Sequence, residues 1–382
     1  MWAITKFILL WCLLQSMLFW PTNLYSRPWL FTLVALALLL FNSKKWFASA
    51  IPTIGLFLIT MLLIGDSIII SGIVPSIALS ITYFIGICLF CLNDSKKQDL
   101  LQFVTKWFGI IIGISFGAYI IWFFTRFAPF GILEQPFGYA DYFNFIFFIL
   151  PKGSFLITRF SGPFIEPGHL GMIAVFIIYA NKFNFKRNRY LWFILTSILF
   201  SLSLAGYVLL ALAYILHKGI KPKQILGITI IAISFFYGVT NLWNNGDNPV
   251  NEKIIERLQY DEKKGISGNN RNLLHTDAFF NQMVEDGTIF KGIGTRESKN
   301  IQEKKIIGGA GIKIYLIIFG IVGLLLVLFY YISIPLVSKN KDFMWKFFIL
   351  ICICFLQRAY PYWIAWLLPY MVASRTEIQK ME

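Results

Sequence analysis

Residues 158–171 read TRFSGPFIEPGHLG and place Arg159, Glu166 and His169 within a chain that is otherwise rich in phenylalanine, isoleucine and leucine. A positioned carboxylate can accept a proton as a general base, and arginine presents a planar set of donors suited to phosphate or carboxylate. Ionisable groups beside long apolar runs are unfavourable unless they have partners or a function. All three are therefore candidate functional residues, with Glu166 the strongest.

The prolines and glycines of this stretch indicate where a helix begins. Pro163, Pro167 and Gly168 disallow a continuous helix, so Glu166 and His169 are expected at a break just before a helix. A glutamate before a proline is also typical of a helix start, with its carboxylate at the positive end of the helix dipole. This structural role and the role of a base are compatible, because both keep the carboxylate ionised.

A second polar stretch, residues 267–298, reads SGNNRNLLHTDAFFNQMVEDGTIFKGIGTRES. It predicts an amphipathic helix that ends at Gly287 and carries Arg271 and His275 four positions apart on one face. The Gly-Ile-Gly turn at 292–294 has amides that can approach an anion, although this pattern alone is weak. A lone histidine beside an arginine is more often structural than catalytic, so Arg271 is the better candidate.

The elements that must position these residues are membrane helices. Of 382 residues, 57% are hydrophobic and 14% are charged, and the mean hydropathy is +0.68. A soluble domain carries about 25% charged residues, so lipid must solvate much of this apolar surface. The five cysteines all fall in apolar runs, which is typical of buried thiols and not of a disulfide or a metal site.

Segments of about 20 apolar residues are needed to cross a bilayer, and shorter ones serve where it is thinned. The sequence predicts an all-α polytopic protein, a single integral membrane domain over 1–382. Twelve segments are expected to span the membrane: 4–20, 28–42, 46–65, 73–92, 104–125, 168–181, 190–204, 205–217, 224–240, 309–332, 344–358 and 361–374.

The connections between these segments differ in charge. Every second connection, together with both termini and the adjoining ends of the spans, carries 18 lysines and arginines against five acidic residues, whereas the opposite side carries 16 against 14. Positive residues mark the cytoplasmic side of a membrane protein. Both termini are therefore expected in the cytoplasm, and the net charge of +15 reports topology and not nucleic-acid binding.

This orientation places two long loops outside, 126–167 and 241–308, and long loops usually carry function. The basic residues near the membrane on that side are mainly arginines: Arg27, Arg126, Arg159, Arg271, Arg296 and Arg358. Each is expected either to bind a phosphate on a lipid or to pair with acidic residues of the same loops. The sequence leaves both readings open.

In this order, the motifs resemble the O-antigen polymerase and ligase superfamily of bacterial surface-polysaccharide enzymes. The resemblance rests on RFSGPFIEP before a span, SLSLAGYVLL, the arginine at the start of the outer-loop helix, the Gly-Ile-Gly turn and IYLIIFGIVGLLL. It covers about residues 140–330. The amino-terminal third matches only in its hydropathy.

The resemblance implies a C-type membrane glycosyltransferase (GT-C) fold that joins undecaprenyl-diphosphate-linked oligosaccharides on the periplasmic face of the bacterial inner membrane. It implies a lipid-linked donor and acceptor, membrane lipid and a chain-length regulator protein as partners, and no cofactor, metal, nucleotide sugar or nucleic acid. Glu166, Arg159 and Arg271 would be catalytic. Four further residues would bind the diphosphate or sugars: Arg296, Arg358, His169 and His275.

One departure separates the branches of this superfamily. Its lipid-A-core ligases have a histidine near the start of the span after the large loop, where this chain reads IIGGAGIKIY, and no histidine follows His275. This favours a polymerase over a ligase that transfers a finished glycan to a lipid or protein. A transporter or flippase of lipid-linked sugars is the other alternative, but transporters usually show internal repeats, and the sequence has none of fixed period.

Overall fold

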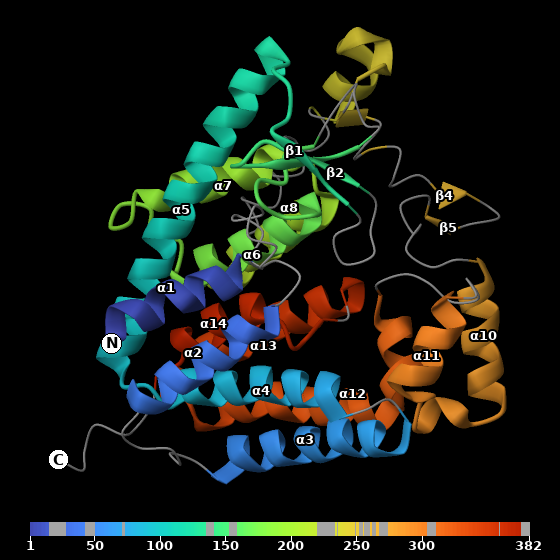
Figure 1. The fold of residues 1–382 in the computed structure, drawn as a ribbon. Coiled ribbons are helices and arrows are strands. Elements are labelled where there is room, and N and C mark those ends of the chain that lie inside the picture. The colour runs from blue at the N-terminus through green and yellow to red at the C-terminus, as the bar shows by residue number, and fades with distance from the viewer. Residues whose placement is uncertain are drawn as a thin grey trace. The chain divides into compact units, whose positions relative to one another are not determined.

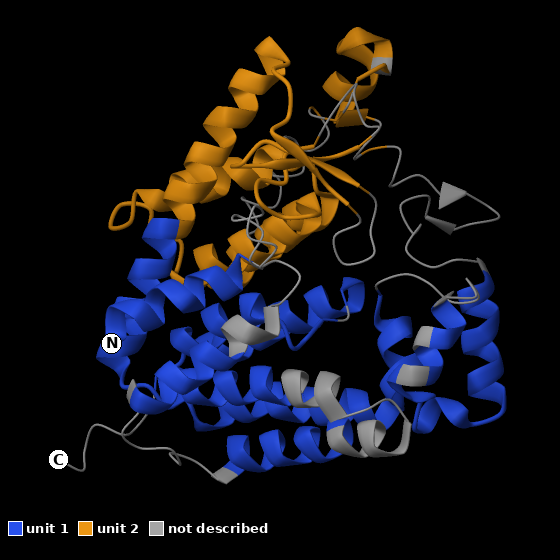
Figure 2. Ribbon diagram, viewed as in Figure 1, with its two compact units in different colours: residues 1–107, 271–382 blue, residues 108–270 orange. Residues whose placement is uncertain are grey.

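The computed structural model describes residues 1–14, 28–42, 50–70, 73–134, 141–152, 159–219, 234, 236–248, 250–251, 255, 260–261, 265–266, 274–303, 311–358 and 360–375. These residues are mostly helical, with little sheet (Figure 1). The chain divides into two compact units (Figure 2). Unit 1 comprises 1–107 and 271–382, and unit 2 comprises 108–270, so the boundary falls inside one long helix.

Unit 1 is a helical bundle. Its elements are α1 (Trp2–Leu13), α2 (Pro28–Asn42), α3 (Ala50–Ile70), α4 (Ile73–Phe90), the first part of α5 (Asp94–Thr125), α10 (Leu274–Glu285), the short helix η8 (Thr288–Phe290), α11 (Gly294–Glu303), α12 (Ile312–Val337), α13 (Lys341–Gln357) and α14 (Ile364–Ala373). Helix α3 packs on α4 and α12, and α4 packs on α14.

Buried tyrosines connect the helices of this bundle. The Tyr330 hydroxyl donates to the carbonyl of Tyr83 at 2.7 Å, and that of Tyr370 donates to the carbonyl of Tyr331 at 2.9 Å. The side chains are at most 2% exposed, and each hydroxyl has an acceptor, as a buried polar group requires. These bonds join α4, α12 and α14.

Unit 2 combines helices with small sheets. It holds the rest of α5, α6 (Pro167–Ala180), α7 (Tyr190–Phe200), α8 (Leu204–Lys218), and the short helices η4 (Gly238–Leu242) and η5 (Asn244–Gly246). Strands β1 (Gly131–Leu133), β2 (Tyr142–Asn144) and β3 (Ile149–Pro151) form an antiparallel sheet in the order β1-β2-β3, and β4 (Tyr260–Asp261) pairs with β5 (Gly265–Ile266). The sequence prediction of an all-α protein omitted these strands, because strands of two or three residues are too short to show an alternating pattern.

Two helices in the described part of the chain, α5 and α12, are long and apolar enough to cross a membrane. They are compatible with a helical membrane protein. Eleven of the twelve predicted segments contain a helix within the described residues, whereas the segment 224–240 lies mostly outside them. The number of spans and their orientation stay predictions.

Candidate active site

The segment that carries Arg159 and Glu166 lies in unit 2 and leads into α6. Residues 160–165 are buried, and Glu166 is the N-cap residue of α6 with extended backbone angles (φ −129°, ψ 138°). Pro167 takes the first helical position, where its missing N–H removes no helical hydrogen bond. The predicted helix start at Glu166-Pro167 is confirmed, and it places the carboxylate at the positive end of the helix.

Main-chain bonds hold this segment on both sides. The amide of Phe160 donates to the carbonyl of Phe200 at the end of α7 (3.2 Å), and the amide of Ile149 in β3 donates to the carbonyl of Gly162 (3.1 Å). The hydroxyl of Ser161 donates to the carbonyl of Ile149 at 3.2 Å. The segment is therefore fixed between the sheet and the α7–α8 turn before α6 begins.

Arg159 contacts the SLSLAGYVLL motif, which begins at Ser201. Its Nε donates to the carbonyl of Ser201 at 3.1 Å, in the turn between α7 and α8. In the same turn the Ser203 side chain accepts from the amide of Gly206 at 3.3 Å and caps α8. The adjoining predicted segments 190–204 and 205–217 thus correspond to two helices, α7 and α8, and the short turn between them orients the guanidinium.

A close helix crossing adds a second contact between the same motifs. A Cβ atom built on Gly171 of α6 would lie 3.2 Å from the Cα of Gly206 in α8. Small residues let helix backbones approach in this way. The two glycines, one from each motif, could have been recognised in the sequence as a candidate crossing point.

Tyr142 of β2 is a neighbour of Glu166 that the sequence did not reveal. The tyrosine is 5% exposed, and burial, followed by the negative charge of Glu166, raises the pKa of its phenol to about 12. The hydroxyl therefore stays protonated at neutral pH. The two positions are 24 residues apart, and nothing in the spacing links them.

His169 lies in the first turn of α6. Its side chain is 3% exposed, and its amide donates to the carbonyl of Glu166 at 3.0 Å. The histidine thus belongs to the packed start of α6. Its suggested role in substrate binding stays a prediction.

In unit 1 the predicted amphipathic helix corresponds to α10. Its apolar face forms a core with α12 through Met283, Ile314 and Ile317, and Lys313 of α12 pairs with Asp277 at 2.8 Å. Gly287, in the left-handed region (φ +75°), follows the end of α10 as predicted. Arg271 and its predicted place on this helix lie outside the described residues, and the side chain of His275 is exposed.

The Gly-Ile-Gly turn meets a break in α12. Gly320 has φ +68° and ψ −175° inside α12, and Gly292 has φ +73°. A Cβ on Gly292 would lie 2.4 Å from the carbonyl oxygen of Ile318, so only glycine fits here. The break in α12 leaves the carbonyl of Ile317 available, and this carbonyl accepts a hydrogen bond from the amide of Ile293 at 2.9 Å. Two further motif segments, 292–294 and 314–326, are therefore in contact.

The remaining arginines of unit 1 lie on separate elements. Arg296 is the third residue of α11, directly after the Gly-Ile-Gly turn. Arg358 ends α13 and is 5% exposed, and its positive charge is favoured at the carboxyl end of a helix. Just beyond it the rings of Tyr360 and Trp363 stack at 4.4 Å.

Arg159, Glu166 and His169 thus lie on one short segment of unit 2, while His275, Arg296 and Arg358 belong to unit 1. Among the described residues no group of three or more His, Cys, Asp or Glu side chains could hold a metal ion. The metal-independent chemistry that the resemblance implies stays an expectation.

No protein-family model, no curated protein and no solved structure matches the chain. The function is inferred from the residues and their geometry.

Proposed function

We propose that the chain is a glycosyltransferase of the O-antigen polymerase and ligase superfamily. It polymerises undecaprenyl-diphosphate-linked oligosaccharide repeat units on the periplasmic face of the inner membrane, as a single GT-C-like membrane domain with twelve spans and both termini in the cytoplasm. The observation that carries the proposal is the hydrogen bond from Arg159 Nε to the carbonyl of Ser201. This bond joins two motif segments, and Arg159 lies seven residues before Glu166, the N-cap residue of α6.

Glu166 acts as the general base in this proposal. It takes the proton from a hydroxyl of the acceptor sugar, and the hydroxyl oxygen forms a bond to the anomeric carbon of the donor. The bond between that carbon and the phosphate oxygen breaks, and its electrons leave with undecaprenyl diphosphate. Removal of the base would cost about 10² to 10⁴ in rate.

Arginines stabilise the charge that develops on the leaving diphosphate. Because this group leaves readily, no general acid is required, and fixed positive charges supply the main stabilisation. Arg159 is oriented for this by its bond to Ser201. Arg271 completes the catalytic set, and four residues assist in binding the diphosphate and sugars: Arg296, Arg358, His169 and His275.

The test is the lipid-linked intermediate that accumulates when the gene is deleted, identified by its mass. A polymerase predicts cell-surface lipid or protein that still carries single repeat units, with no longer polymer. Surface acceptors without any repeat unit would indicate a ligase. Repeat units retained on the cytoplasmic leaflet would indicate a flippase and would overturn the proposal.

A further inference from the structure

The turn of the β2–β3 hairpin has an unusual composition. It reads Phe-Ile-Phe-Phe over residues 145–148, and Ile146 has φ +69°. Hairpin turns with positive φ ordinarily carry glycine, asparagine or aspartate, and a β-branched residue there is strained. The side chains of Ile146 and Phe147 are 38% and 43% exposed. Bulky apolar residues at an exposed turn indicate surroundings that are not water.

Main-chain groups of Phe145, Ile146 and Phe147 in this turn form hydrogen bonds within the protein. The Ser115 hydroxyl donates to the carbonyl of Phe147 at 2.6 Å, and Asn144 Oδ1 accepts from the amide of Ile146 at 2.7 Å. The amide of Phe147 donates to the carbonyl of Phe145 at 2.8 Å. Ser115 and Asn144 are at most 1% exposed. Irregular backbone at membrane depth is tolerated where its polar groups bond to the protein and do not face lipid unpaired.

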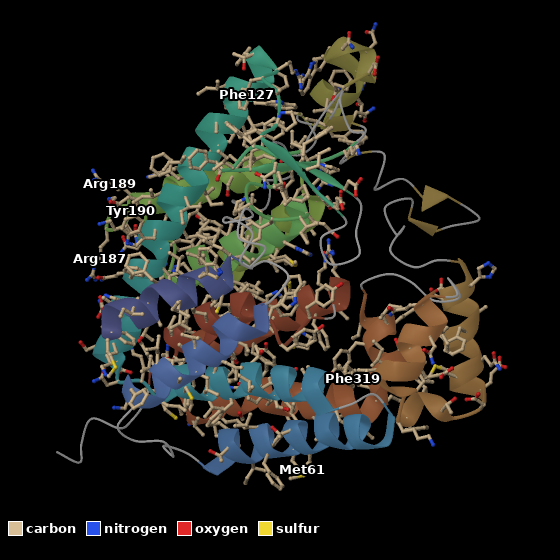
Figure 3. The ribbon with its side chains drawn as sticks, viewed as in Figure 1. Met61, Phe127, Arg187, Arg189, Tyr190 and Phe319 are labelled. Carbon is tan, nitrogen blue, oxygen red and sulfur yellow. The ribbon has the colours of Figure 1, made fainter. Side chains whose placement is uncertain are left out.

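The turn lies beside the apolar half of α5. Ser115 is ten residues before the end of α5 at Thr125, which is roughly 15 Å along the helix axis. The stacked rings of Phe145 and Phe148 contact Trp122, with centroids at 5.6 and 6.2 Å. Phe127, labelled in Figure 3, lies just after the end of α5, and its ring centroid is 5.5 Å from that of Phe145.

Helix α5 shows the same preference for an apolar environment. Ile114, Ile121 and Phe124 are 49%, 59% and 79% exposed, and their spacing of seven and three residues places them on one face. Such a stripe on a helix long enough to cross a membrane faces lipid. Phe130 and Ile132, which follow, are 63% and 47% exposed and extend the apolar surface to β1.

We propose that the β2–β3 hairpin is a re-entrant element whose turn enters the membrane beside α5. The side chains of Ile146 and Phe147 then contact the acyl chains of the surrounding lipid. The position of the hairpin in the membrane does not depend on the reaction. The bond from Ile149 to Gly162 ties the hairpin to the segment before Glu166, so under the proposed function the position of the hairpin also sets that of the base. The base would lie at the membrane boundary, where a lipid-linked diphosphate is found.

Spin labels test the position of the turn in lipid nanodiscs. Phe147→Cys and Ile146→Cys are made after the five native cysteines are replaced by alanine, with Ile114→Cys as the lipid-facing reference. Lys152→Cys is the matched control, since Lys152 lies at the other end of β3 and its side chain is 48% exposed. Labels at 146 and 147 are expected to collide with oxygen as often as at 114, and with a water-soluble nickel chelate several-fold less often than at 152. Chelate collisions at 146 and 147 equal to those at 152 would overturn the proposal.

A second measurement uses the unmodified chain and does not depend on labelling the turn. A phospholipid with a diazirine in its acyl chain is irradiated in the same nanodiscs, and the adducts are located by peptide mass spectrometry. Adducts on residues 145–148 are expected, at a yield comparable to that on the exposed face of α5. Adducts on α5 without any on the hairpin would contradict the proposal, whatever the activity of the protein.

Discussion

The two units position their candidate residues in different ways. In unit 2, the segment 159–171 is held by main-chain bonds and by the bond from Arg159 Nε to Ser201, and it crosses α8 at two helical glycines. In unit 1, the Gly-Ile-Gly turn fits against the break at Gly320, where both glycines have positive φ and backbone atoms lie within 2.4–2.6 Å of a Cβ built at either position. Unit 2 concentrates its candidate chemistry in one short segment, whereas unit 1 depends on a backbone contact between distant segments.

The two units should therefore respond differently to single substitutions. A side-chain substitution in unit 2 removes a proposed chemical group and leaves the backbone that holds it. In unit 1 the contact itself consists of backbone, so a single methyl group is enough to disturb it.

The largest effect is expected for Glu166→Gln, which keeps the shape of the side chain and removes its basicity. The rate of polymerisation by the purified protein should fall by about 10² to 10⁴. Glu134→Gln is the matched control, because Glu134 is an exposed carboxylate in the same segment between α5 and α6. Equal rates for the two variants would remove Glu166 from the chemistry.

Arg159→Ala is expected to lower the rate by about 10² to 10³, the usual loss for one positioned donor to a developing oxyanion. Arg159→Lys keeps the charge but loses the planar guanidinium that bonds Ser201, and should recover part of the rate. Initial rates at saturating donor measure this, with Lys152→Ala as a control cation of the same loop. A fully active alanine variant would assign Arg159 a structural role only.

Gly320→Ala and Gly292→Ala should each lower the free energy of unfolding by about 2–5 kcal/mol, since left-handed strain and a backbone collision add. Gly287→Ala is the matched control. It also has positive φ (+75°), but a Cβ there would meet nothing within 4 Å, so only the strain of about 1–2 kcal/mol is expected. Melting temperatures in detergent compare the three, and identical shifts would argue against the contact.

The smallest effect is expected at the crossing of α6 and α8. Gly171→Ala brings its Cβ to 3.2 Å from Gly206 and should destabilise unit 2 by about 1–2 kcal/mol. Gly117→Ala in α5, where a Cβ would meet nothing within 4 Å, should instead stabilise the helix by about 0.5–1 kcal/mol. Shifts of melting temperature with the same sign would show that the crossing is looser than described.

Local signals in the sequence predicted the local structure of the candidate site. Glu166-Pro167 marked the start of α6 and Gly287 the end of α10, because each signal depends on a few neighbouring residues.

Contacts between distant segments could not be predicted in this way. The neighbourhood of Tyr142 and Glu166, the fit of Gly292 against Gly320, and the burial of Arg358 depend on tertiary packing. The sheet between α5 and α6 was missed because its three-residue strands give no periodic signal.

The central claim is that the acid of unit 2 and the arginine before α10 face the same outer side of the membrane. Glu166→Cys, Arg271→Cys and Arg187→Cys in a cysteine-free background test it with a membrane-impermeant maleimide on spheroplasts. Positions 166 and 271 are predicted to react before permeabilisation, and the exposed position 187 only afterwards. Reaction at 166 or 271 only after permeabilisation would contradict the claim.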